Sequence, residues 1–254
     1  MRIIIVGAAF AVLAACAGVS APAGDVAPAP AQAAKLQGYL SADALHGAQI
    51  LPPPPAADSP RGLADRAAYE ETRALKDTPR WAAAIQDNDL WTGGAVRRYS
   101  CALGVDLSEK TTPAVMRILR RIELDGRTVG TPPKDHYARP RPALGNDKPI
   151  CVPRADWLKT NASYPSGHSL VEWSWALILT ELIPSKADVA LKLGQEMGES
   201  RVVCGVHYPS DVEAGRTLGA GMVARLHADP AFTADMAAAK AELAKPPPAP
   251  VGCG

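Results

Sequence analysis

Three short segments of the chain carry side chains that could hold and transfer a charged group. They are Lys134–Pro142, Tyr164–His168 and Ser200–Asp211. The candidates among their side chains are two histidines (His168, His207), three cations (Lys134, Arg141, Arg201) and the carboxylate of Asp211. Each segment alone is unspecific, because basic loops are usually solvated, Pro-Ser-Gly is a common turn, and a His–Asp pair is more often structural. Their combination is the set of groups needed for phosphoryl transfer without a metal.

The cations could hold the non-bridging oxygens of a phosphate group. Lys134, Arg141 and Arg201 would supply positive charge where negative charge is spread in the transition state. Arginine suits this task because its planar guanidinium bonds two phosphate oxygens at once. The turn at Ser166-Gly167, which begins an apolar helical pattern, would add free N–H groups and the positive end of a helix dipole.

The two histidines could share the covalent and proton-transfer steps. One imidazole can attack phosphorus while the other protonates the leaving alkoxide. Asp211 follows His207 by four residues, so its carboxylate can bond one ring nitrogen and leave the other unprotonated for attack.

Length and composition limit the class of protein. The 254 residues allow one large domain or two small ones, and we expect one. Lys+Arg is 27 and Asp+Glu is 26, so the net charge of +1 argues against a nucleic-acid-binding protein. Hydrophobic residues make up 47%, enough for a sizeable core, yet no apolar run approaches the roughly 20 residues of a membrane-spanning helix.

The N-terminus is typical of an export signal. An apolar run from Ile3 to Ala15 follows Arg2, and Leu-Ala-Ala-Cys ends at Cys16 as in a bacterial lipobox. Cys16 is therefore a lipidation candidate; the alternative is ordinary cleavage at a nearby alanine. Both predict a periplasmic protein, and lipidation would anchor it to the outer membrane. The expected organisation is residues 1–16 signal peptide, 17–39 Ala/Pro-rich tether, 40–245 folded domain and 246–254 Pro-rich tail.

Export affects how the cysteines are interpreted. Without Cys16, four cysteines remain, which suggests two disulfides with three alternative connectivities. We prefer Cys151–Cys204, because the chemistry above brings their neighbours together, and this leaves Cys101–Cys253. None lies in a CxxC pattern, which argues against a zinc site.

Helix-start signals dominate the chain and predict an all-α fold. Ser59, Thr78, Thr112 and Asp229 each precede a proline, the pattern of an N-cap followed by the first helical residue. Ser185 and Ser210 are further cap candidates, and an apolar helix is expected over 166–182. Residues 132–165 hold seven prolines and are expected to form a connecting segment.

The spacing of the three segments resembles the signature of the type 2 phosphatidic acid phosphatase superfamily. That signature is Lys-x6-Arg-Pro, then Pro-Ser-Gly-His, then Ser-Arg-x5-His-x3-Asp, and eleven fixed positions match in order. Over about residues 40 to 245 the chain further resembles the secreted class A non-specific acid phosphatases of bacteria. The wider similarity includes Ile50–Pro55, Gly93-Gly94, Lys134–Tyr137, Ser163–His168 and Val203–Gly205.

The resemblance implies a helical bundle and a set of roles. It makes His207 the nucleophile that forms a phosphohistidine, His168 the general acid, and Asp211 the partner of His207. Phosphate would be bound by Lys134, Arg141, Ser166, Gly167 and Arg201. It implies a broad-specificity acid phosphatase, acting on small phosphate monoesters, that needs no metal or other cofactor. It further implies a homodimer, inhibition by vanadate, and phosphotransfer to alcohols as a second outcome.

The sequence alone is compatible with other functions. A vanadate-dependent haloperoxidase shares the oxyanion pocket, and a non-catalytic surface lipoprotein could merely bind anions. Lipid phosphatases carry the motif on several membrane helices, which this chain lacks. A metal hydrolase could in principle use Asp135, His136, His207 and Asp211, but would leave the cation cluster unexplained.

Some polar residues near the motifs have no assigned role. His136 and Arg139 are expected to be supporting or surface residues, and His46 and His227 structural or exposed ones. Selectivity is expected to depend on residues around the pocket mouth, near Ser100 and Tyr137.

Overall fold

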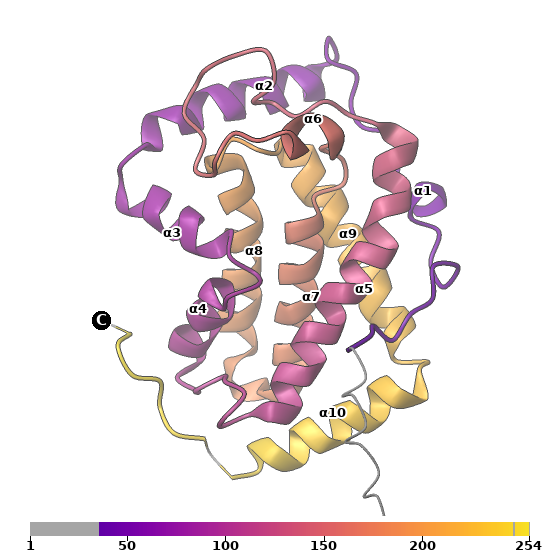
Figure 1. The fold of residues 1–254 in the computed structure, drawn as a ribbon, viewed down its shortest axis with the longest axis vertical. Helices are drawn as coiled ribbons and strands as arrows, with labels where there is room; N and C mark the ends of the chain where they lie inside the picture. Colours follow the sequence, from indigo (N-terminus) through magenta and orange to yellow (C-terminus); the bar gives the residue numbers. More distant parts are fainter. Residues whose placement is uncertain (1–35, 246, 254) are drawn as a thin grey trace, which may run out of the picture. The chain divides into compact units, whose positions relative to one another are not determined.

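The structure is a computed structural model that describes residues 36–245 and 247–253 (Figure 1). Throughout this described part every regular element is a helix, which confirms the all-α fold class. The predicted signal peptide and Cys16 lie outside the described residues. The helices are α1 (Gly47–Ile50), α2 (Pro60–Thr72), η1 (Arg73–Leu75), α3 (Pro79–Asp87), α4 (Gly94–Leu103), α5 (Pro113–Tyr137), α6 (Trp157–Thr160), α7 (Gly167–Leu182), η2 (Pro184–Lys186), α8 (Ala187–Val203), α9 (Pro209–Leu226) and α10 (Pro230–Leu243).

The four Pro-marked helix starts are confirmed. The side chains of Ser59, Thr78 and Asp229 each accept a hydrogen bond from the backbone N–H three residues later, at the starts of α2, α3 and α10. Thr112 precedes α5 without a side-chain cap, because its hydroxyl oxygen accepts from the N–H of Ser108 instead.

Two predicted caps are wrong. Tyr208, not Ser210, occupies the N-cap of α9, and the Asp211 carboxylate accepts from the Tyr208 N–H at 2.8 Å. Ser185 lies inside the short η2 helix, and α8 begins after Lys186. At α9, Pro209 takes the first helical position and puts the N-cap upstream of Ser210. Pro184 starts η2, which includes Ser185, so α8 begins downstream of that serine.

Helix α5 continues through Pro132 and Pro133, so the connecting segment begins after Tyr137 and not at residue 132. Proline has a helix-compatible φ but removes a hydrogen bond and crowds the preceding turn. Burial of Pro133 against Gly47 at the α1–α5 contact helps to offset that cost. As a result, Lys134 lies in the last turn of a helix, whereas the sequence suggested a loop.

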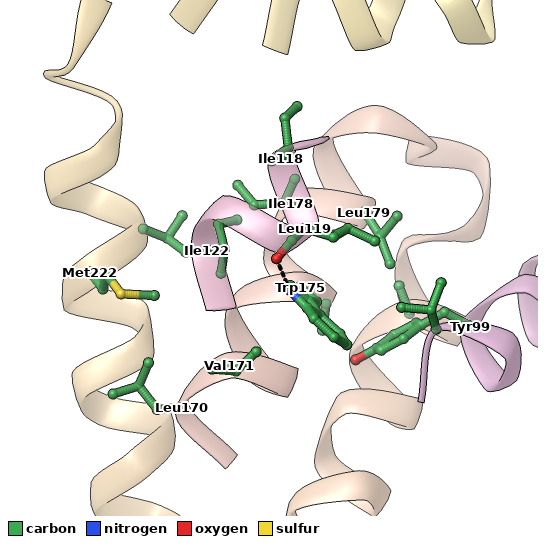
Figure 2. Close-up of a cluster of buried hydrophobic side chains, with 14 of the residues drawn as sticks. Tyr99, Ile118, Leu119, Ile122, Leu170, Val171, Trp175, Ile178, Leu179 and Met222 are labelled. Carbon is green, nitrogen blue, oxygen red and sulfur yellow. Dashed lines mark hydrogen bonds between the residues drawn. The ribbon is translucent and has the colours of Figure 1, made fainter. Parts of the chain in front are cut away.

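Helix α7 is the centre of the bundle and packs against α5, α8 and α9 (Figure 1). Its buried side chains meet those of α5 in the apolar core shown in Figure 2. There the Trp175 indole N–H donates to the Leu119 carbonyl at 2.9 Å, joining α7 to the N-terminal half of α5. A helix that is apolar on nearly all sides needs this kind of enclosure.

Glycines allow α9 to approach α7 closely. A Cβ on Gly219 would lie 2.7 Å from the Leu170 carbonyl oxygen, and one on Gly215 would collide with the Ser166 carbonyl oxygen. Because the start of α7 and the start of α9 carry motif residues, this contact sets how those residues face each other.

Two disulfides join the cysteine pairs preferred from the sequence. Cys151–Cys204 fastens the segment after Arg141 to the end of α8, with Cα atoms 4.6 Å apart. Cys101–Cys253 joins α4 to the C-terminal segment, where the Asp106 N–H also donates to the Pro248 carbonyl at 3.0 Å.

Candidate active site

The three sequence motifs meet at one cavity of about 780 Å³. Six of the eight predicted catalytic and phosphate-binding residues line it: Lys134, Arg141, Gly167, His168, Arg201 and His207. The other two, Ser166 and Asp211, are fully buried behind it. The cavity therefore brings together residues from α5, α7, α8 and the two connections that carry Arg141 and His207.

The start of α7 forms the turn that the sequence predicted to bind an anion. Ser166 caps the helix by accepting from the Ser169 N–H, and its own N–H donates to the Asp211 carbonyl at 2.9 Å. The first N–H groups of the helix, at Gly167 and His168, have no partner within the helix. Free N–H groups and the helix dipole therefore meet the cavity beside the cations.

Three cations lie at the same end of the cavity. Lys134 Nζ donates to the Ala162 carbonyl at 2.5 Å, and Arg141 donates to the backbone and side-chain oxygens of Asn161. Burial, followed by repulsion from Arg141, lowers the pKa of Lys134 to about 7. Burial lowers the pKa values of Arg141 and Arg201 to about 10, so both guanidinium groups stay charged in acid and neutral solution.

His207 is held with one ring nitrogen toward Arg141. Arg141 Nη1 lies 3.1 Å from His207 Nε2, and because a guanidinium can only donate, Nε2 must accept and carry no proton. The other nitrogen, Nδ1, lies 3.5 Å from an Asp211 carboxylate oxygen and 3.4 Å from the Ser163 hydroxyl. Burial, then Arg141, Lys134 and Arg201, lowers the pKa of His207 well below its usual value.

Asp211 has more partners than the sequence suggested. Its Oδ2 accepts from the Ser163 hydroxyl at 2.5 Å, so Ser163 shares the space between Asp211 and His207. Its Oδ1 accepts from Arg139 at 2.5 Å, and Arg139 also donates to Asp65 of α2 at 2.8 Å. Arg139, expected to be a supporting or surface residue, is therefore the half-buried counter-ion of Asp211.

His168 faces the loop between α3 and α4. Its Nε2 lies 3.1 Å from the Asn88 backbone carbonyl, which can only accept, so Nε2 carries a proton. The Asn88 side chain accepts from Arg201 at 2.7 Å, so one residue holds both groups. Burial and then Arg201 lower the pKa of His168 well below its usual value. The sequence predicted the direction from the cations alone, but burial is the larger cause.

Comparison with known proteins identifies the family of the chain. Residues 124–232 match the PAP2 superfamily. The chain is 40% identical over 210 residues to a non-specific acid phosphatase of Providencia stuartii, covering 82% of this chain and 85% of the relative. The chain belongs to the non-specific acid phosphatases of the PAP2 superfamily. It is also 41% identical to an acid phosphatase of Zymomonas mobilis (77% and 74% covered) and 37% identical to a non-specific acid phosphatase of Salmonella typhimurium (76% and 78% covered).

This non-specific acid phosphatase has a buried carboxyl next to Arg201, one of the three cations of the cavity. Among the described residues, neither carboxyl oxygen of Glu172 has a hydrogen-bond partner, and neither has Arg201 Nε. Burial, followed by the charge of Asp87, raises the pKa of Glu172 to about 8. At acid pH Glu172 is thus neutral and leaves the positive charge of Arg201 available to an anion.

Other predicted residues do not join the site. Ser100 is buried in α4, and the Tyr137 hydroxyl donates to the Leu51 carbonyl; neither lines the cavity, so the expected mouth residues were wrong. His46 and His136 are exposed, and His227 pairs with Glu181 on the surface. Within residues 36–245 and 247–253, no group of three potential metal ligands is close enough to hold an ion, and no helix is long and apolar enough to cross a membrane.

Proposed function

We propose that the protein hydrolyses phosphate monoesters with broad specificity through a phosphohistidine on His207. The observation that supports this most strongly is the convergence of two histidines, three cations and the start of α7 on one cavity. Lys134, Arg141, Arg201 and the N–H groups of α7 would bind the three non-bridging oxygens. Side chains thus supply the positive charge that a metal provides in other phosphatases.

In the first step, His207 Nε2 attacks phosphorus and the bond between phosphorus and the ester oxygen breaks. Arg141 would shift its donated hydrogen bond from Nε2 to a phosphate oxygen when substrate enters. Asp211 and Ser163 lie beside Nδ1 and would stabilise the positive charge that the ring gains. The lowered pKa of His207 keeps the nucleophile neutral in mildly acidic solution.

His168 would give its proton to the leaving alkoxide. Because its Nε2 proton is bound to Asn88, Nδ1 is the nitrogen that can carry the transferable proton. The bound phosphate dianion would raise the pKa of His168 again, since it places negative charge beside the ring. In the second step neutral His168 takes a proton from water, which attacks the phosphohistidine and releases phosphate. An alcohol in place of water would give phosphotransfer.

Location and assembly follow from the same proposal. The N-terminal signal pattern supports export to the periplasm, with Cys16 as the candidate lipid anchor. The homodimer stays a prediction, as does inhibition by vanadate, which would occupy the cation end as a mimic of the transition state.

A chromogenic phosphate monoester tests the proposal. The wild-type protein should hydrolyse it at pH 5 to 6 in the presence of EDTA, with activity falling above neutral pH, and vanadate should inhibit. His207→Ala should remove activity by several orders of magnitude. Wild-type activity that disappears with EDTA and returns with a divalent metal would contradict the proposal. Halide oxidation with vanadate and peroxide, in a protein without phosphatase activity, would favour the haloperoxidase alternative.

A further inference from the structure

The cavity is much larger than a phosphate group needs. Its volume of about 780 Å³ lies in the range of sites for whole organic ligands, about 300–1,000 Å³. The cations and histidines occupy one end. Half of the other side chains that line it are apolar, and two of these are tryptophans: Leu90, Trp91, Val152, Pro153, Trp157 and Val171.

Trp91 lies on the loop that holds the proposed general acid. Asn88, at the start of this loop, accepts from His168, so the leaving oxygen must be protonated beside it. The Asp89 carboxylate fixes the loop by accepting from the backbone N–H groups of Trp91, Thr92 and Gly94 at 2.8 to 3.2 Å. The Trp91 side chain is 44% exposed although the loop is well held, which leaves indole surface free to contact a ligand.

Trp157 lies on α6 and also lines the cavity. The Arg141 guanidinium carbon is 4.8 Å from the centre of the Trp157 ring. Because Arg141 binds phosphate in the proposed function, Trp157 lies next to the phosphate group, within reach of the first atoms of a leaving group.

Helix α5 lines a third side of the cavity with polar side chains. Arg127 lies 3.9 Å from the centre of the Trp91 ring and 3.6 Å from the Glu123 carboxylate. Burial raises the pKa of Glu123 to about 7, so this carboxyl can donate or accept a hydrogen bond in weakly acidic solution. The contact with Arg127 also steadies the Trp91 indole.

We propose that the outer part of the cavity is a leaving-group subsite for flat aromatic groups, with Trp91 and Trp157 as its apolar walls. This inference rests on the proposed phosphatase function, because it concerns the part of the ester that departs. Flat rings pack against indoles by stacking or edge contacts, which contribute beyond the area they bury. A puckered aliphatic ring of similar size buries similar area but lacks those contacts.

Two matched esters test the subsite: 2-phenylethyl phosphate and 2-cyclohexylethyl phosphate. Both release a primary alkoxide, so the reacting oxygens are alike and only the ring differs. We expect the wild type to prefer the phenyl ester in kcat/KM by about 2- to 10-fold, the size of an aromatic contact. Trp91→Leu should bring the ratio close to 1, and Trp91→Phe should retain most of the preference.

Inhibition by inorganic phosphate distinguishes the role of Trp91 from that of Trp157. Trp91→Leu should leave the inhibition constant within about twofold of wild type, since the cation packed on Trp91 is Arg127, not one of the three proposed to bind phosphate. Trp157→Leu should weaken inhibition because it unpacks Arg141. An unchanged ester ratio in Trp91→Leu, or no preference in the wild type, would overturn the subsite. If the wild type hydrolyses neither ester, the proposed function itself fails.

Discussion

At the scale of single residues, burial lowers the pKa values of the cations that we propose bind phosphate. Lys134 is the cation with the greatest sensitivity to pH, because its pKa of about 7 lies far below that of an exposed lysine. Below pH 7 it is charged, and above pH 7 it loses its proton. The binding end of the cavity therefore holds one positive charge fewer in alkaline solution.

Anion affinity should follow this titration. Sulfate is a suitable competitive probe, because it stays a dianion across the range. Its inhibition constant should rise about tenfold between pH 6 and pH 8.5, since a hydrogen bond to a charged group is lost. Lys134→Arg keeps its charge and should show a much smaller rise. A parallel loss of affinity in both proteins would show that Lys134 is not the group that titrates.

Arg139 is the residue whose importance the sequence did not reveal. It forms ion pairs with Asp211 and Asp65, and its side chain is only 11% exposed. Arg139→Ala would leave two buried carboxylates without their counter-ion, at a cost of about 3–5 kcal/mol in the free energy of unfolding. We expect kcat to fall in the same variant, because Asp211 would lose the partner that fixes it beside His207.

Two comparisons distinguish positioning from a general loss of stability. Arg139→Lys should restore part of kcat, and Asp65→Asn should destabilise the protein while leaving Arg139 on Asp211. If all three variants lose stability and kcat remains normal at a temperature where they are folded, Arg139 does not act through Asp211.

The sequence indicated the reacting groups but not their supports. Lys134, His168 and His207 lie in short motifs whose residue types and spacing are rare. Such motifs can be recognised from the sequence alone. The Asp65–Arg139 pair joins residues 74 positions apart, so no local sequence pattern predicts it. Asn88 contacts His168 through a backbone carbonyl, which every residue type has, so residue identity carried no signal.

At the scale of helices, the approach of α9 to α7 fixes the site. Gly215 faces the Ser166 carbonyl, so an added methyl group must push the start of α7 away from α9. The sequence did not predict this contact, because a glycine within a predicted helix indicates only a low helix propensity. The four helix starts marked by a cap residue and a proline were predictable, because caps and prolines act locally. The continuation of α5 through two prolines was not, because it depends on packing against α1.

Gly215→Ala should therefore weaken both the fold and the site. We expect a loss of about 1–3 kcal/mol in the free energy of unfolding, as for overpacking in a core, and a raised inhibition constant for phosphate. Gly221→Ala is the matched control on the same helix, because the nearest atom to its added Cβ is 3.9 Å away. Chemical denaturation and phosphate inhibition of both variants measure the two effects. Equal behaviour of the two variants would show that the α7–α9 contact does not constrain the site.

At the scale of the whole molecule, the two disulfides differ in how near they lie to residues that line the cavity. Cys204 lies three residues before His207, and Cys151 donates its N–H to the Cys204 carbonyl at 3.1 Å. Cys101–Cys253 instead ties down the C-terminal segment across 152 residues of sequence, and neither cysteine lines the cavity.

Removing each disulfide should separate stability from activity. Replacing Cys101 and Cys253 by serine should cost about 2–5 kcal/mol of stability with little change in kcat/KM. Replacing Cys151 and Cys204 should also reduce kcat/KM, because the connection that carries His207 loses its support. Thermal unfolding and initial rates at a permissive temperature provide the comparison. A greater loss of kcat/KM in the first pair than in the second would contradict this arrangement.

The most direct test of the account is to find the phosphoryl group on His207. His168→Ala, mixed with p-nitrophenyl phosphate, should be phosphorylated, because the p-nitrophenolate leaving group needs no proton. The phosphoenzyme should then hydrolyse slowly, because the attacking water lacks His168 as its base. Quenching in alkaline denaturant preserves a nitrogen–phosphorus bond, and peptide mass spectrometry locates it. We predict a phosphoryl adduct on His207 in His168→Ala and none in the His168→Ala, His207→Ala double variant. An adduct on another residue, or turnover by the double variant at the rate of His168→Ala, would contradict the account.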